Sequence, residues 1–173
     1  MIIAGIGSRE TPDRILNEMR AIGAWCWEQE IWIRSGHADG ADWAFERGAQ
    51  EYCIAYLPWA GFNSQLISKA HQHVVHESRW LDKLVWTYHP APDKLTRGPF
   101  ALMRRNGAQV LGIDDTQRSQ AIVCWTSDGL ASGGTGQAIR IAQSSNYNIP
   151  VLNMQRPMYN TAEKVIAYLQ GER

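Results

Sequence analysis

Two stretches of the chain have the residue types and spacing of an anion-binding turn. Residues 33–45 and 121–145 each begin as an apolar run, break into glycine and small polar residues, and then take up helical spacing. Each stretch is typical of a strand, a tight turn and a helix, and Gly36 and Gly40 permit backbone geometries that other residues avoid. Amides opening a helix at about residues 38–41 would present free donors and a positive dipole end, so both turns predict a phosphate-binding edge.

A third turn, residues 7–9, follows the apolar run 2–6. The guanidinium of Arg9 matches a phosphate group, and Ser8, Ser35 and Thr135 offer hydroxyls. Because the carboxyl ends of parallel strands share one edge of a sheet, we expect the three turns to meet there. The ligand-binding residues that these turns predict are Gly7, Ser8, Arg9, Ser35, Gly36, His37, Ala38, Asp39, Gly40, Asp42, Gly133, Gly134, Thr135, Gly136 and Gln137.

Asp39 and Asp42 stand at the start of the helix that follows the first turn. One of them can simply complement the helix dipole. Two carboxylates beside a phosphate would repel it, so we expect at least one to bind sugar hydroxyls or an amide that holds the loop.

The composition restricts the class of protein. With 173 residues we expect one domain, 1–173, and the 17 basic and 17 acidic residues cancel, so no overall positive field draws the chain to nucleic acid or a membrane. Cys26, Cys53 and Cys124 lie in apolar runs, which favours free thiols in a reducing compartment. The chain shows neither a signal-peptide pattern nor a long apolar span, and we expect it to be cytoplasmic.

Short apolar runs alternate with helical patterns along most of the chain, which predicts a doubly wound, mainly parallel α/β sheet of Rossmann-like type. An insertion at about 59–96 carries two helix-like runs, 66–74 and 80–85, and should cover one edge of the sheet. Thr11 and Asn160 are the expected caps of the first and last helices. The expected strands are 2–6, 31–34, 52–57, 121–125 and 150–153, and the expected helices are 12–26, 41–49, 99–110, 137–145 and 162–169.

Histidines and aromatic residues in the insertion offer two further hypotheses. His71, His73 and His76 invite a metal site, but on a helix only two of them share a face, so a solvated helical face is favoured and we expect no metal. We expect no cofactor either. Trp59, Phe62, Trp80 and Trp86 could stack on a nucleobase, although packing within the insertion is favoured for each.

Residues 5–9, 34–42 and 133–136 together resemble the SLOG superfamily of Rossmann-like proteins, and the similarity extends over nearly the whole chain. Within that superfamily the chain is most similar to small DprA-like proteins often found in phages and prophages. The resemblance implies several activities: loading of recombinase on single-stranded DNA, LOG-type phosphoribohydrolase activity, and binding of ADP-ribose-derived signals. It also implies self-association, because members commonly form dimers.

Two LOG motifs can be compared directly. Residues 102–106 resemble the Met-x-x-Arg-Lys helix, which makes Arg105 and Asn106 candidate ligand contacts, and residues 132–140 resemble the Pro-Gly-Gly-x-Gly-Thr-x-x-Glu turn. The position of the catalytic Glu holds Arg140, and a guanidinium can neither activate water nor stabilise an oxocarbenium ion. If the protein is an enzyme, Arg105 and Asp39 are the candidate catalytic residues, and Asp42 or Asp128 could also replace the missing carboxylate.

The sequence thus favours a homo-oligomeric protein that binds a nucleotide or nucleotide-derived small molecule, for example by sequestering an ADP-ribose-type signal. A nucleoside-monophosphate N-glycosidase is one alternative. DprA-like binding of single-stranded DNA is another, less favoured because the basic residues are scattered.

Overall fold

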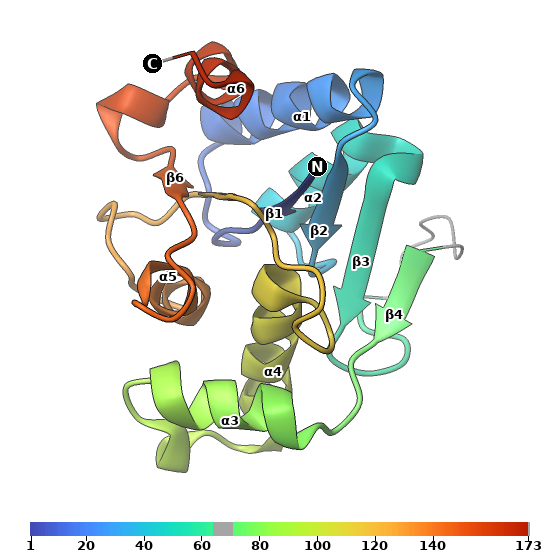
Figure 1. The fold of residues 1–173 in the computed structure, drawn as a ribbon, viewed down its shortest axis with the longest axis vertical. Coiled ribbons are helices and arrows are strands. Elements are labelled where there is room, and N and C mark those ends of the chain that lie inside the picture. Colours follow the sequence, from blue (N-terminus) through green and yellow to red (C-terminus); the bar gives the residue numbers. More distant parts are fainter. Residues whose placement is uncertain (64–70, 173) are drawn as a thin grey trace.

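In the computed structural model, which describes residues 1–63 and 71–172, one sheet of six parallel strands runs in the order β4-β3-β2-β1-β5-β6 (Figure 1). The strands are β1 (Ile2–Gly5), β2 (Trp32–Ser35), β3 (Cys53–Leu57), β4 (Gln72–Val74), β5 (Ile122–Cys124) and β6 (Val151–Asn153). The helices are α1 (Asp13–Glu28), α2 (Ala41–Ala49), α3 (Arg79–Tyr88), α4 (Arg97–Leu111), α5 (Gly136–Gln143) and α6 (Ala162–Gln170), with short 3-10 turns η1 (Gln50–Tyr52), η3 (Pro92–Lys94) and η4 (Pro157–Tyr159).

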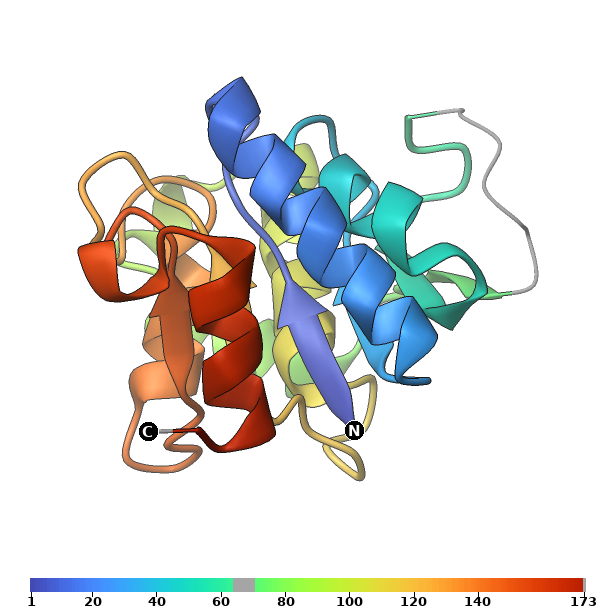
Figure 2. The ribbon, with the colours of Figure 1, turned by 90° about the horizontal axis from the view of Figure 1, so that it is seen from above.

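Helices cover both faces of the sheet, which confirms the predicted doubly wound α/β class. One buried cluster joins Ile3 and Ile33 of the sheet to α1, α2 and α6, and Phe45 is fully buried within it. The other joins Ala4 and Ile122 to α3, α4 and α5. Figure 2 shows α1 and α6 on the side of the sheet away from α4. Burial of each large apolar side chain contributes roughly 1.5–3 kcal/mol, so these two layers hold the strand ends in place.

The winding of the sheet reverses between β1 and β5. The chain proceeds outward from β1 through β2 and β3 to β4, and then returns to place β5 on the other side of β1. At such a point the connections after the two neighbouring strands turn to opposite faces, which leaves room for a ligand beyond their carboxyl ends.

The helix expected over 66–74 is wrong where the structure describes it. Residues 72–74 form β4, which pairs in parallel with β3 (Ala55 with Gln72, Leu57 with Val74), and residues 66–70 lie outside the described residues. The free edge of β3 supplies backbone partners, and this tertiary pairing overrides local helical spacing. The second expected run, 80–85, is confirmed as part of α3.

Two helices begin one residue from where the caps were predicted. Pro12 is the N-cap of α1, while the hydroxyl of Thr11 donates to the carbonyl of Ser8 at 2.7 Å. At α6 the capping oxygen is that of Thr161, which accepts from the Lys164 amide at 3.5 Å, and not that of Asn160. Neither difference changes the order of helices and strands along the chain.

Across residues 1–63 and 71–172, every helix is too short or too polar to cross a membrane.

Candidate functional site

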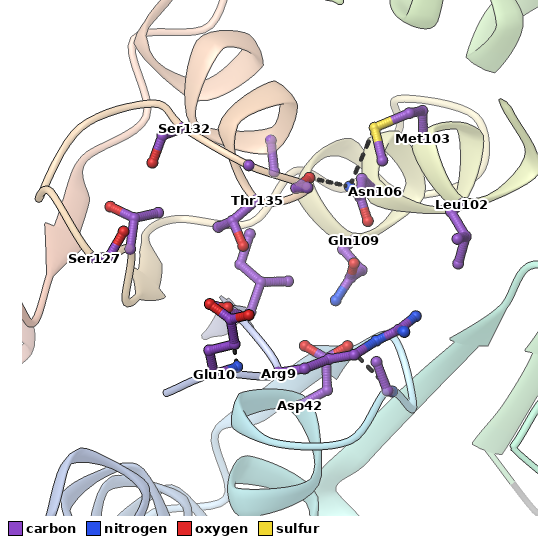
Figure 3. Close-up of a pocket in the computed structure, with 18 of the residues that line it drawn as sticks. Arg9, Glu10, Asp42, Leu102, Met103, Asn106, Gln109, Ser127, Ser132 and Thr135 are labelled. Carbon is purple, nitrogen blue, oxygen red and sulfur yellow. Dashed lines mark hydrogen bonds between the residues drawn. The ribbon is translucent and has the colours of Figure 1, made fainter. Parts of the chain in front are cut away.

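A cleft of about 550 Å³ opens at the carboxyl ends of β1 and β5, where the sheet reverses its winding. Figure 3 shows its walls: the connections after β1 and β5, the start of α2, and one face of α4. Its lining residues are Ile6, Gly7, Ser8, Arg9, Glu10, Ala38, Asp42, Leu102, Met103, Arg105, Asn106, Gln109, Thr126, Ser127, Asp128, Ser132, Gly133, Gly134, Thr135 and Ala138.

All three predicted turns contribute to this cleft, but not with every predicted residue. Those on its lining are Gly7, Ser8, Arg9, Ala38, Asp42, Arg105, Asn106, Gly133, Gly134 and Thr135, and their contact with a ligand stays a prediction. Those outside the lining are Ser35, Gly36, His37, Asp39, Gly40, Gly136 and Gln137. Sequence reasoning missed Gln109, although its spacing of four residues from Arg105 places both on one helical face.

The first turn is closed by carboxylates from α2. Oε1 of Glu46 accepts from the Ser35 hydroxyl at 2.5 Å and from the His37 amide at 3.0 Å, and Oε2 lies 2.9 Å from Nδ1 of His37. The Ala38 amide donates to Oδ2 of Asp42 at 3.3 Å. The expectation of free amide donors is therefore wrong for residues 37 and 38, because α2 supplies the acceptors itself.

The second turn is open. Gly133 and Gly134 are exposed, and a Cβ at either position would meet no other atom within 4 Å. Nδ2 of Asn106 on α4 donates to the Gly134 carbonyl at 2.9 Å and so holds the turn from one side. The backbone of this turn is therefore exposed on the lining of the cleft.

Arg140 lies behind the second turn, off the cleft lining. Its Nε donates to the carbonyl of Tyr88 at 2.6 Å, and its Nη1 donates to that of Ala131 at 2.8 Å. Arg140 thus ties the loop after β5 to the end of α3, and burial lowers its pKa. Arg140 thus makes structural contacts and does not line the cleft.

Three buried polar residues, Asp42, Arg105 and Gln109, form the floor of the cleft. Nη1 of Arg105 donates to Oδ2 of Asp42 at 3.1 Å and to Oε1 of Gln109 at 2.9 Å. Burial raises the pKa of Asp42 to about 6 although the Arg105 charge opposes that shift. Arg105 and Asp42 therefore hold one another as a buried ion pair.

The charges on the cleft lining are mixed. Arg9 is exposed and has no hydrogen bond or ion pair within the described parts of the chain, and Arg105 is paired with Asp42. Glu10 is exposed, while Asp128 accepts from the Leu130 amide and the Ser132 hydroxyl, which lowers its pKa. Two basic and three acidic residues thus line the cleft, so it is not a basic groove.

Of the carboxylates proposed as catalytic substitutes, Asp42 and Asp128 reach the cleft lining, and Asp39 does not. Asp39 is exposed and accepts from Nδ2 of Asn63 at 3.2 Å. Across residues 1–63 and 71–172, no three side chains of His, Cys, Asp or Glu gather closely enough to hold a metal ion. His73 lies on β4, so the expected helical face does not exist there.

The aromatic residues of the predicted insertion divide into two kinds. Trp59 and Trp86 are exposed, and Trp59 makes an edge-to-face contact with Phe62 at a ring distance of 5.1 Å. Trp80 packs against the apolar cluster under α3. Base stacking thus stays open for Trp59 and Trp86, while Trp80 follows the packing alternative.

No protein-family model matches the chain, and no curated protein sequence matches it. A solved structure does: DNA processing protein A from Helicobacter pylori, whose study describes its single-stranded DNA binding mode. The two structures have a TM-score of 0.56 and 13% sequence identity, and the match covers 99% of this chain and 73% of that chain. The DprA-like, Rossmann-like fold that the sequence predicted is therefore shown.

Proposed function

We propose that the cleft binds the phosphate-bearing part of a nucleotide or nucleotide-derived small molecule. The observation that supports it best is the open turn at Gly133 and Gly134, which lines the same cleft as Arg9, whose guanidinium has no ion pair among the described residues. Backbone amides at the start of α5 and a guanidinium offer complementary donors to a phosphate, and the reversal of winding is where such sheets bind ligands.

The mixed charge favours a small ligand over a long polyanion. A strand of phosphates would have to pass Glu10, Asp42 and Asp128 as well as Arg9. A molecule with one or two phosphates can place them on the open turn and direct its neutral groups to the acidic side. Because Arg140 is fixed by two carbonyls, we propose that such a ligand, an ADP-ribose derivative for example, is held without cleavage.

Isothermal titration with adenine and guanine nucleotides tests this proposal. Arg9→Ala should weaken binding about tenfold or more, as loss of a charge-assisted hydrogen bond predicts. Arg20→Ala removes an equal charge from an exposed position on α1 and should leave affinity unchanged. Mass spectrometry after denaturation should recover the ligand intact, whereas release of free base would show an N-glycosidase instead.

Binding of single-stranded DNA is the second candidate, and the structural comparison favours it over a small ligand. The DNA processing protein whose structure matches 99% of this chain is described as binding single-stranded DNA. The exposed Trp59 and Trp86 provide aromatic surfaces on which bases could stack.

Oligonucleotide titrations over a range of salt concentrations distinguish the two candidates. Strand binding should weaken steeply as salt rises and should weaken again in Trp59→Ala or Trp86→Ala. Binding of a mononucleotide should change little in those two variants. Flat or absent oligonucleotide binding at low salt would exclude the DNA candidate.

A further inference from the structure

We infer that the floor of the cleft, formed by Asp42, Arg105 and Gln109, recognises a hydroxyl group of a ribose. This inference rests on the proposed function, because it concerns the sugar of the same nucleotide ligand. It goes further in naming the sugar as the part that the buried floor selects.

Each of the three residues keeps one buried polar atom that has no hydrogen-bond partner among residues 1–63 and 71–172. These atoms are Oδ1 of Asp42, Nε of Arg105 and Nε2 of Gln109. The residues are only 3%, 5% and 0% exposed, so bulk water does not replace the missing partners at their surfaces. A buried polar atom without a partner is costly, and all three residues line the cleft, where a ligand can supply the missing partners.

The shared contact with Arg105 fixes which ends of the other two side chains remain free. Nη1 of Arg105 can only donate, so the atoms facing it must be oxygens: Oδ2 of Asp42 and Oε1 of Gln109. The orientation of the Gln109 amide follows from this contact, and its Nε2 becomes the free end. Figure 3 shows Gln109 on α4 and Asp42 on α2 with their side chains directed toward one another.

The free atoms comprise one carboxylate oxygen that accepts and two nitrogens that donate. A hydroxyl both donates and accepts, so one hydroxyl can donate to Asp42 and accept from Gln109 at the same time. The two hydroxyls of a ribose would add an acceptor for Nε of Arg105. A phosphate oxygen fits poorly, because it cannot donate and would be repelled by ionised Asp42.

The experiment is titration of the intact protein with the four common ribonucleoside 5′-diphosphates and their 2′-deoxy counterparts. For the base that binds best, removal of the 2′-hydroxyl should weaken binding about tenfold or more. Gln109→Leu removes the free donor, and Asp42→Asn turns its oxygen to Arg105 and leaves an NH₂ group toward the ligand. In both variants the ratio of the affinities for the ribose and deoxyribose forms should fall to nearly one. Asp93→Asn, at an exposed position on η3, should leave that ratio unchanged.

Each outcome bears on a defined claim. Equal binding of ribose and deoxyribose forms overturns the inference and leaves phosphate binding intact. A ribose preference that persists in both variants, verified as folded by circular dichroism, also overturns it, as does a preference that follows the base and ignores the sugar. If no nucleotide binds the wild-type protein, the proposed function itself fails, and the inference with it.

Discussion

The guanidinium of Arg105 occupies the space that a side chain at Gly36 would need. A Cβ built on Gly36 would lie 1.1 Å from Nη1 of Arg105 and 2.8 Å from Oδ2 of Asp42. Gly36 was predicted as a ligand-binding residue, but the group that lies against it is the guanidinium of Arg105. Gly36 lies outside the cleft lining, but it supports the floor by leaving room for the Arg105 guanidinium.

Gly36→Ala should displace Arg105 and break its contacts with Asp42 and Gln109. Breaking a buried ion pair and overfilling its site should lower the free energy of unfolding by roughly 2–5 kcal/mol. Chemical denaturation measures this loss. Gly98→Ala is the matched control, because a Cβ there meets nothing within 4 Å and Ala favours the helix. A Gly36→Ala protein as stable as the control would show that Arg105 can be placed elsewhere without cost.

The fold was predictable because its signals are local. Short apolar runs separated by helical spacing gave five strands, and the turns that follow β1 and β5 reached the predicted cleft. The sixth strand, β4, carried no such signal: Gln72 and His73 are polar, and only pairing with β3 makes them a strand. An edge strand of three residues depends on its neighbour more than on its own sequence.

The site was predictable in position and less so in detail. Ser35 and His37 look like phosphate ligands from their place after a strand, but Glu46, in the second turn of α2, binds both of them. The use of Arg140 to hold two carbonyls likewise depends on α3, which is distant in sequence. Contacts of this kind arise from tertiary packing and cannot be predicted from the spacing of residues within one segment.

Arg140→Glu places a carboxylate where the resemblance to the LOG motif would put one, and tests whether the chain then cleaves nucleotides. The carbonyls of Tyr88 and Ala131 would lose their donors and face a negative charge. We expect a loss of roughly 2–4 kcal/mol in unfolding free energy and no release of base from nucleoside monophosphates. Arg140→Gln, which keeps a donor, should lose less stability. Base release by the Glu variant would contradict the structural role of Arg140.

Asn106→Ala should loosen the open turn without unfolding the protein. The Gly134 carbonyl would lose the donor that holds it, at a cost of about 1 kcal/mol in stability. Nucleotide affinity should fall several-fold, because the amides of the turn are no longer held in one arrangement. Titration calorimetry measures the change, with the exposed Asn17→Ala as control. Unchanged affinity would show that the phosphate does not use this turn.

Asp42 should make stability fall as pH rises between about 4 and 6. Its pKa is raised from 3.8 to about 6 by burial, with Arg105 opposing and Glu46 adding to the shift. In that window the unfolded chain has lost its proton at Asp42 and the folded protein keeps it, so the folded state binds more protons. The stabilisation is complete below the unfolded pKa and is lost as pH rises through the folded pKa.

Asp42→Asn should make this slope less negative by up to about 1.4 kcal/mol per pH unit, the value for one proton. Arg105 from α4 faces Asp42, Glu46 lies on the same helix, and Arg9 lines the same cleft, and all three are unchanged in this variant. Urea denaturation at several pH values between 4 and 6 measures the slope, with Asp93→Asn as the control. Parallel curves for wild type and Asp42→Asn would mean that this carboxyl group is already ionised in the folded protein at pH 4.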